Sequence, residues 1–329
     1  MANLNTTDME VFVDQKFILH QVKFWLILVL QIPAILISLL IFVFLFTHRP
    51  VLRSPQNQIL CILLTINLIQ LAFDLPLPLH FYYHGYVSSA SPRFCMFWTF
   101  FEFTLYATSE FLVATMSIQR HILIFSSHVL RIRWKHIVFY DLPILFCLVY
   151  PITFYACIIF FYPCDGRIPY DYTNNLCGFT DCYLMYDRFW GTYDWLVNNG
   201  SPMCIDSLAN FFLIMRVVQQ KHRRQQNVSW RQQRHMIRQL FCVSTLYIIG
   251  WGPCLVVGVY QIFVDPNFLS AVQSGYLLDL IYGICLFLPW MYLGVLPDFK
   301  KWILVLCRCG QRPNTVGTTV QRNRIETAL

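Results

Sequence analysis

Seven long apolar runs are the feature that most constrains how this chain folds. A helix needs roughly 20 apolar residues to cross the hydrocarbon core of a bilayer. Runs that meet or approach this length cover Phe24–Phe46, Ile59–Leu79, Met96–Ile118, Ile137–Phe161, Trp190–Val218, Leu240–Phe263 and Ser274–Leu296. Barrel strands would alternate apolar and polar residues, so these continuous runs predict helices. The sequence therefore predicts an all-α membrane protein with a bundle of seven transmembrane helices.

Composition favours a membrane protein over one large soluble core. Charged residues make up 12% of the 329 residues, whereas soluble domains carry about 25%, and the mean hydropathy is +0.51. The fifth run is the least regular because Asn198, Asn199 and Asp206 interrupt it. It is included because the number of spans and the topology then agree. The first run is too long for the core of a cleavable signal peptide, so we expect it to act as its own insertion signal.

Lys and Arg are distributed unequally between the two sides of the predicted bundle. If the chain starts outside, the external segments contain five of the 24 Lys and Arg residues, and the other nineteen lie on the opposite side. The positive-inside rule therefore predicts an extracellular N-terminus in the plasma membrane. The net charge of +7 then marks a cytoplasmic face next to anionic lipid, not a nucleic-acid surface. Asn5, in Asn5-Thr6-Thr7, becomes a candidate glycosylation site.

Four of the thirteen cysteines lie in the predicted external segments. They are Cys95, Cys164, Cys177 and Cys182. An oxidising exterior permits disulfides, and four cysteines allow three pairings. The cysteines inside the predicted spans are expected to pack as small apolar residues.

The third, sixth and seventh runs each carry a short motif. These motifs are Gln119-Arg120-His121, Tyr247 with Trp251-Gly252-Pro253, and Leu288-Pro289-Trp290-Met291-Tyr292. Taken alone, the arginine could be a basic anchor at the membrane interface. Each proline removes a helical hydrogen bond and favours a kink. A bulky ring beside such a kink can couple the position of a ligand to helix bending.

In order and spacing, these motifs resemble those of rhodopsin-like (class A) G-protein-coupled receptors, of which the chain resembles a divergent member. The family's motifs read Asp/Glu-Arg-Tyr, Cys-Trp-x-Pro and Asn-Pro-x-x-Tyr, so Gln119, His121, Gly250 and Leu288 depart from them. The resemblance implies that the sixth helix swings outward to admit a heterotrimeric G protein. The switch residues that it implies are Gln119, Arg120, His121, Tyr247, Trp251, Pro253, Pro289 and Tyr292.

The segment after the seventh run resembles the family's short eighth helix. Phe299, Trp302, Ile303 and Leu306 recur at helical spacing beside two lysines, which predicts an amphipathic helix on the inner leaflet. Cys307 and Cys309 are either palmitoylation sites or reduced surface thiols. The last four residues, Glu326-Thr327-Ala328-Leu329, fit a pattern read by PDZ domains. The predicted divisions are an extracellular segment 1–23, a receptor domain 24–296, helix 8 at 297–309 and a disordered cytoplasmic tail 310–329.

The resemblance also implies a disulfide arrangement. Pro202 stands at the family's proline position in the fifth span, and Cys182 precedes it by 20 residues, a typical separation in the family. This implies a bridge from Cys95 to Cys182 and leaves Cys164 to pair with Cys177. A bridge from Cys95 to Cys177 is the alternative.

Ionisable residues inside membrane spans are costly and mark candidate functional sites. Glu102 lies seven residues after Cys95, where amine receptors of the family carry an acidic ligand anchor, and Tyr282 matches a tyrosine that faces this anchor. The resemblance thus implies a cationic ligand, either an amine or a basic peptide. Its expected contacts are Glu102, Tyr106, Trp251, Asp279 and Tyr282. The alternative is that Glu102 is neutral and only structural.

Two further departures concern the switch and the family's sodium pocket. Gln119 and Gln233 stand where the family places acids that restrain Arg120, so we predict weak restraint and measurable ligand-free signalling. If Asn67 is the family's second-span asparagine, its aspartate position is Ala72. Asp74 lies two residues out of phase, and the sequence therefore does not predict the sodium pocket.

Other classes of membrane protein fit the sequence less well. A seven-span ligand-gated channel or transporter is the main alternative, but transporters usually contain internal repeats, and none is visible. The spans contain no paired aspartates, His–Glu–His cluster or Ser/His couple. The sequence therefore predicts no enzyme, metal site or cofactor.

Overall fold

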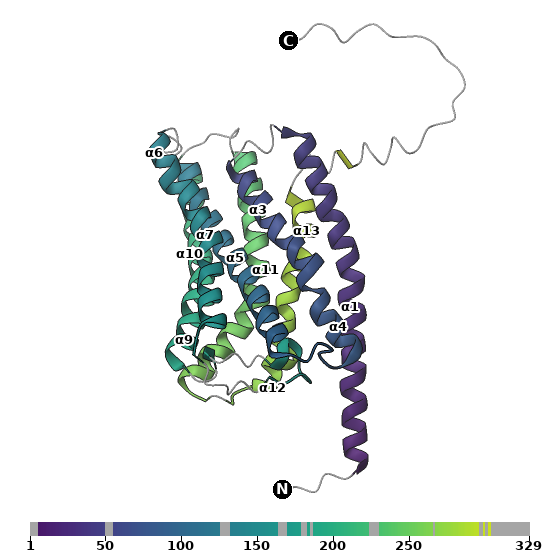
Figure 1. The fold of residues 1–329 in the computed structure, drawn as a ribbon. Helices are drawn as coiled ribbons and strands as arrows, with labels where there is room; N and C mark the ends of the chain where they lie inside the picture. Colours follow the sequence, from purple (N-terminus) through teal and green to yellow (C-terminus); the bar gives the residue numbers. More distant parts are fainter. Residues whose placement is uncertain are drawn as a thin grey trace, which may run out of the picture.

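The fold is helical throughout the part of the chain that the structure describes. The computed structural model describes residues 6–49, 55–125, 132–163, 170–178, 183–184, 187–223, 230–265, 267–295, 299 and 302–303. No strand occurs among them. Figure 1 shows the long helices running side by side, with the start of α1 (Thr6–Thr47) extending past the others. At 1.5 Å per residue, this 42-residue helix is about 63 Å long.

Five of the α-helices in the described part of the chain are continued by a turn of π-helix. The first half of the chain contains α3 (Pro55–Ile69), η1 (Gln70–Asp74), α4 (Pro76–His84), α5 (Pro92–Phe125), α6 (Arg133–His136), η3 (Ile137–Asp141), α7 (Leu142–Tyr155) and η4 (Ala156–Phe160). The second half contains the 3₁₀ turn η5 (Asn175–Gly178), α9 (Arg188–Tyr193), η6 (Asp194–Gly200), α10 (Ser201–Arg223), α11 (Trp230–Phe263), α12 (Ser270–Val272), η7 (Gln273–Leu277) and α13 (Leu278–Val295).

Five helical stretches of the described chain are long and apolar enough to cross a membrane. They are Gln15–Thr47, Asn57–His84, Arg133–Phe160, Phe241–Phe263 and Ser270–Gly294. They coincide with five of the seven predicted spans. The remaining two predicted spans are also helical, but α5 and the stretch from η6 through α10 carry buried acidic residues. The protein is therefore an all-helical membrane protein.

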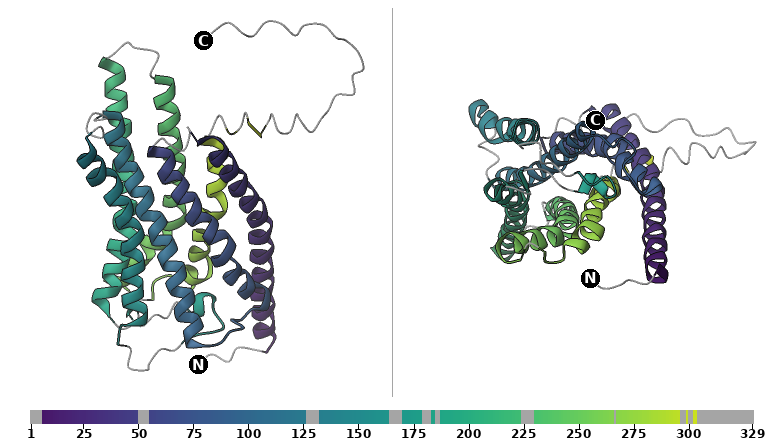
Figure 2. Two further views of the ribbon diagram at one scale, coloured as in Figure 1. Left: turned by 45° about the horizontal axis from the view of Figure 1, so that its top comes forward. Right: turned by 60° about the horizontal axis from the view of Figure 1, so that its bottom comes forward.

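Helix α5 lies in the interior of the bundle. It packs against α3, α7, α10 and α11, while α1 contacts α4 and α13. Figure 2 shows α1 at the edge of the arrangement. Because these neighbouring helices surround α5, its polar side chains are shielded from the exterior of the bundle. Glu102, Glu110 and Arg120 are each less than a tenth exposed.

Two glycines let α11 approach its neighbours closely. A Cβ atom at Gly250 would lie 2.6 Å from Ile284 Cγ1 of α13, and one at Gly258 would lie 2.8 Å from the Trp195 ring of η6. Contacts this short would force a shift of the facing side chain. The departure at Gly250, where the family has cysteine, therefore permits the close packing of α11 on α13.

Asp74, which is out of phase with the family's motif, faces the interior of the bundle. In the structure, Ala72 is exposed and Asp74 is fully buried in η1. Asn67, Gln70, Leu71 and Asp74 are all buried, at the i, i+3, i+4 and i+7 spacing of one helix face. The motif spacing of the family pointed to Ala72, but the buried face of this helix contains Asp74.

The disulfide joins Cys95 to Cys177, so the implied Cys95–Cys182 and Cys164–Cys177 pairings are both wrong and the alternative is right. The backbone carries Cys177 to the start of α5, because Val87 N–H donates to Tyr172 O at 2.9 Å and Asp171 N–H donates to Cys177 O at 3.0 Å. The sequence did not reveal this fold-back. Leu176 and Cys177 both have φ of +52°, a left-handed conformation uncommon for such residues. Cys164 and Cys182 lie outside the described residues.

Side-chain hydrogen bonds hold the segment 170–178 in this shape. Asp171 accepts from Thr173 Oγ1 at 2.6 Å and from Asn174 Nδ2 at 2.5 Å. The hydrogen bond from the Thr173 hydroxyl holds the pKa of Asp171 below its ordinary value. The segment is therefore fixed by local hydrogen bonds as well as by the disulfide.

Little of the predicted eighth helix falls within the described residues. Phe299 is fully buried and packs on Phe44 of α1, with ring centroids 5.3 Å apart, and Trp302 lies 5.7 Å from the same ring. These contacts attach the segment after α13 to the end of α1. Asn5, Cys307, Cys309 and the last four residues all lie outside the described residues.

Candidate functional site

The bundle has two ends that differ in chemistry. The disulfide end contains the Cys95–Cys177 bridge, and the arginine end contains Arg120. A cavity of about 160 Å³ opens at the disulfide end between α5, η6, α11 and α13, with residues of segment 170–178 along one side. Six aromatic residues line it, namely Phe103, Tyr106, Tyr155, Trp195, Trp251 and Tyr282. Two acids, Glu102 and Asp194, also line it, and no basic residue does so among the described residues.

Glu102 is the buried acid that the sequence singled out. Its Oε1 accepts a hydrogen bond from the Tyr282 hydroxyl at 3.0 Å, whereas its Oε2 has no hydrogen-bond partner among the described residues. The Tyr106 ring centroid lies 6.2 Å from that of Trp251 and 6.4 Å from that of Tyr282. Four of the five predicted ligand residues therefore line one cavity and contact one another.

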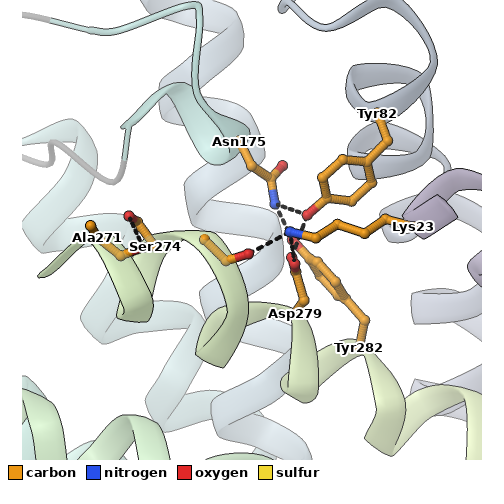
Figure 3. Close-up of polar contacts among 8 residues, drawn as sticks. Lys23, Tyr82, Asn175, Ala271, Ser274, Asp279 and Tyr282 are labelled. Carbon is orange, nitrogen blue, oxygen red and sulfur yellow. Dashed lines mark hydrogen bonds and ion pairs between the residues drawn. The ribbon is translucent and has the colours of Figure 1, made fainter. Parts of the chain in front are cut away.

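Asp279, the fifth predicted ligand residue, is paired with a cation from the chain itself. Lys23 of α1 reaches across to α13, where its Nζ lies 2.5 Å from Asp279 Oδ2 and also donates to the carbonyl of Gly275 (Figure 3). The Tyr82 hydroxyl of α4 donates to the other carboxylate oxygen. The negative charge of Asp279 is thus already balanced, and Asp279 does not line the cavity.

Asn175 connects this ion pair to the cavity. Its side-chain amide donates to the Tyr82 hydroxyl at 3.3 Å and to the Tyr282 hydroxyl at 3.1 Å (Figure 3). Tyr282 in turn donates to Glu102. A continuous path of polar contacts therefore runs from Lys23 on α1, through the segment next to the disulfide, to the acid in the cavity.

Asp194 is a site residue that sequence reasoning missed. Its carboxylate is buried and accepts from Tyr155 at 2.7 Å, from Asn198 at 2.7 Å and from Tyr183 at 3.0 Å. The available signal was its position near the start of the fifth apolar run, inside the predicted span. Asp194 is the first residue of the π-helix η6 and lines the cavity.

A second buried acid forms a polar cluster toward the arginine end. Asp206 Oδ1 accepts from Ser117 at 2.5 Å, from Ser244 at 2.9 Å and from Asn210 at 3.0 Å. Asn210 also donates to the Ser244 hydroxyl at 2.6 Å. These four residues, here called the Asp206 cluster, join α5, α10 and α11.

The predicted switch residues occupy the interior near this cluster. Arg120, Tyr247 and Tyr292 are almost fully buried. Pro253 and Pro289 lie inside α11 and α13. The Tyr292 hydroxyl donates a hydrogen bond to the backbone carbonyl of Leu60 in α3, at 3.5 Å. His121 Nε2 lies 2.6 Å from the backbone carbonyl oxygen of Ala209 in α10.

Gln119 lies next to Arg120 in the sequence, but its described hydrogen bonds go to η3. Its amide donates to the backbone carbonyls of Phe139 and Tyr140 in η3, at 3.3 and 3.2 Å. The side chain of Gln233 is not among those described. Near Arg120, the Asp206 cluster joins α5 to α11 through Ser117, Asp206 and Ser244.

Comparison with known families identifies the class of protein. The family described as 7 transmembrane receptor (rhodopsin family) matches residues 26–292. The chain therefore belongs to the rhodopsin family of G-protein-coupled receptors, which are receptors and not enzymes. No curated protein matches the chain.

Proposed function

We propose that this receptor binds a small cationic amine at the disulfide end and activates a heterotrimeric G protein at the arginine end. The observation that carries the proposal is the state of Glu102. It is a buried acid in an aromatic-lined cavity, with one carboxylate oxygen free of hydrogen bonds among the described residues. An ammonium group would satisfy this oxygen, and the faces of Tyr106, Trp251 and Tyr282 attract cations.

The size of the cavity favours an amine over a basic peptide. Its volume of about 160 Å³ is close to that of an engineered cavity of about 150 Å³ that binds benzene. A ligand with a single small ring or a short chain fits such a space. Several peptide residues do not.

The proposed topology follows the distribution of charge and the family. In it, α5 and the stretch from α9 through α10 are the third and fifth of seven spans, and the disulfide end faces outside at the plasma membrane. The N-terminus is then extracellular, and the segment after α13 forms a helix on the inner leaflet. The same proposal includes the division of the chain into segments that end at residues 23, 296 and 309.

The mechanism is a two-state switch that the ligand biases. An amine bound at Glu102 contacts Trp251 of α11, two residues before Pro253, where a helix kink is expected. Outward movement of α11 about this proline separates Ser244 from Asp206 and uncovers Arg120 for the G protein. A ligand shifts this equilibrium only to the extent that it binds the open state more tightly.

The test is nucleotide exchange on a panel of Gα subtypes, measured against a series of small amines. Replacing Glu102 by Gln keeps the size of the side chain but removes its charge. Loss of a buried charge pair costs about 3 kcal/mol, so the half-maximal amine concentration should rise about 100-fold.

The matched control is Glu110→Gln, which makes the same change two turns further along α5, away from the cavity. It should leave the amine response within a few-fold of wild type at equal surface expression. An amine response that is unchanged in Glu102→Gln would refute the proposed anchor. Amine-evoked conductance without G-protein activation would instead indicate a channel.

A further inference from the structure

Two acidic side chains line the cavity. Glu102 and Asp194 are both less than a tenth exposed. Neither has an ionic partner among the described residues, whose ion pairs include Lys23–Asp279 and His136–Asp141. Buried charges in proteins are normally paired. When both carboxylates are ionised, two cationic groups would therefore balance them.

The two carboxylates belong to different walls of the cavity. Glu102 is on α5 and is hydrogen-bonded to Tyr282 of α13. Asp194 is on η6 and is hydrogen-bonded to Tyr155 of α7 and to Tyr183. The two carboxylates therefore lie on separate helices, so each can bind its own ammonium group.

The two carboxylates differ in the hydrogen bonds that they accept, and each arrangement leaves the group able to bind a cation. Glu102 Oε2 lacks a hydrogen-bond partner among the described residues. Asp194 is held in one orientation by three donors, and all three are neutral groups, so they fix the carboxylate without neutralising it. Aromatic rings stand beside both acids. Tyr282 donates to Glu102, and Tyr155 and Tyr183 donate to Asp194.

We propose that the ligand is a short diamine, with one ammonium group on Glu102 and the other on Asp194. This inference rests on the proposed function and specifies its ligand class. A cavity of about 160 Å³ accepts a ligand of about six to eight heavy atoms, judged from the benzene-sized cavity of similar volume. Straight-chain diamines with four to six carbons, of which 1,4-diaminobutane is the smallest, are in about this range.

The experiment compares diamines with monoamines of equal length on the wild-type receptor and on two variants. In wild type, the best diamine should act at a concentration at least 10-fold lower than 1-aminopentane. Asp194→Asn should raise the half-maximal concentration of the diamine to that of the monoamine and leave the monoamine unchanged. Glu102→Gln should weaken both ligands.

The outcomes separate this inference from the proposed function. Equal potency of diamines and monoamines in wild type would overturn the diamine assignment while leaving an amine receptor. A lack of response to every amine would overturn both. The monoamine response of Asp194→Asn shows whether that variant folds. If it does not fold, the wild-type comparison alone decides the question.

Discussion

Two buried acids, Asp206 and Glu102, show how the two ends of the bundle use the same chemistry differently. Asp206 accepts three hydrogen bonds that join α5, α10 and α11. Glu102 accepts one hydrogen bond from a tyrosine, and its other oxygen has no hydrogen-bond partner among the described residues. Toward the arginine end, the acid is used to join helices. At the disulfide end, it is left available for a ligand.

This difference has an energetic consequence. A buried polar atom without a partner costs about 1–3 kcal/mol, and the cavity also removes packing contacts between the helices around it. The disulfide end must therefore be stabilised by other means, and the structure contains two. These are the Cys95–Cys177 bridge and the Lys23–Asp279 ion pair. Changing each of these features tests the comparison.

The largest effect is expected from the disulfide. Cys95→Ser should lower stability by about 2–5 kcal/mol and reduce surface expression. Cys177→Ser should have the same effect, and the double variant should be no worse than either single one, because both remove the same bond. Thermal unfolding of the solubilised receptor measures this. The exposed thiol Cys157 provides the control, since Cys157→Ser should change stability by less than about 0.5 kcal/mol. Additive losses in the double variant would disprove the pairing.

An intermediate effect is expected from the Asp206 cluster. Asp206→Ala removes the shared acceptor of Ser117, Ser244 and Asn210 and should cost about 2 kcal/mol. Because the cluster restrains α11, ligand-free nucleotide exchange should also rise above the basal level predicted for the wild type. Asp206→Asn keeps an acceptor oxygen and should produce about half of both effects. Unchanged basal exchange in Asp206→Ala would show that the cluster is not the restraint.

The smallest effect is expected from Lys23. Lys23→Met removes the partner of Asp279, and because the pair is partly exposed to solvent, stability should fall by only about 1 kcal/mol. Replacing Asp279 by Asn in the same variant should recover most of this loss, since the unpaired charge is then removed. Lys16→Met, at an exposed position of the same helix, is the control. If the double variant is less stable than Lys23→Met, the two residues do not act as a pair.

The sequence predicted the overall class of fold because hydrophobic runs report directly on membrane-spanning helices. The family resemblance implied four cavity residues, Glu102, Tyr106, Trp251 and Tyr282, and the structure brings them together. Their shared cavity could be anticipated because order and spacing along a regular helix determine which side chains share a face. Their role in ligand binding stays a prediction.

The failures occurred where the backbone departs from a regular helix. Asp74 was judged out of phase by counting from the family's motif, and the structure buries it in η1. Asp194 was not singled out, and the structure places it at the first position of η6, in the cavity lining. The disulfide was misassigned because two left-handed residues redirect the chain at Cys177. The Lys23–Asp279 pair joins residues more than 250 positions apart. No local pattern in the sequence indicates that contact.

The position of segment 170–178 bears on how quickly the proposed ligand would exchange. Asn174, Asn175, Leu176 and Gly178 form part of the cavity lining, and the disulfide ties this stretch to α5. A ligand bound as proposed would meet this tethered segment both on entering and on leaving. Association and dissociation would then be slowed by the same barrier, while the ratio of the two rates, and hence the equilibrium affinity, would be unchanged. In this proposal, the segment sets the residence time of the ligand and the two acids set its affinity.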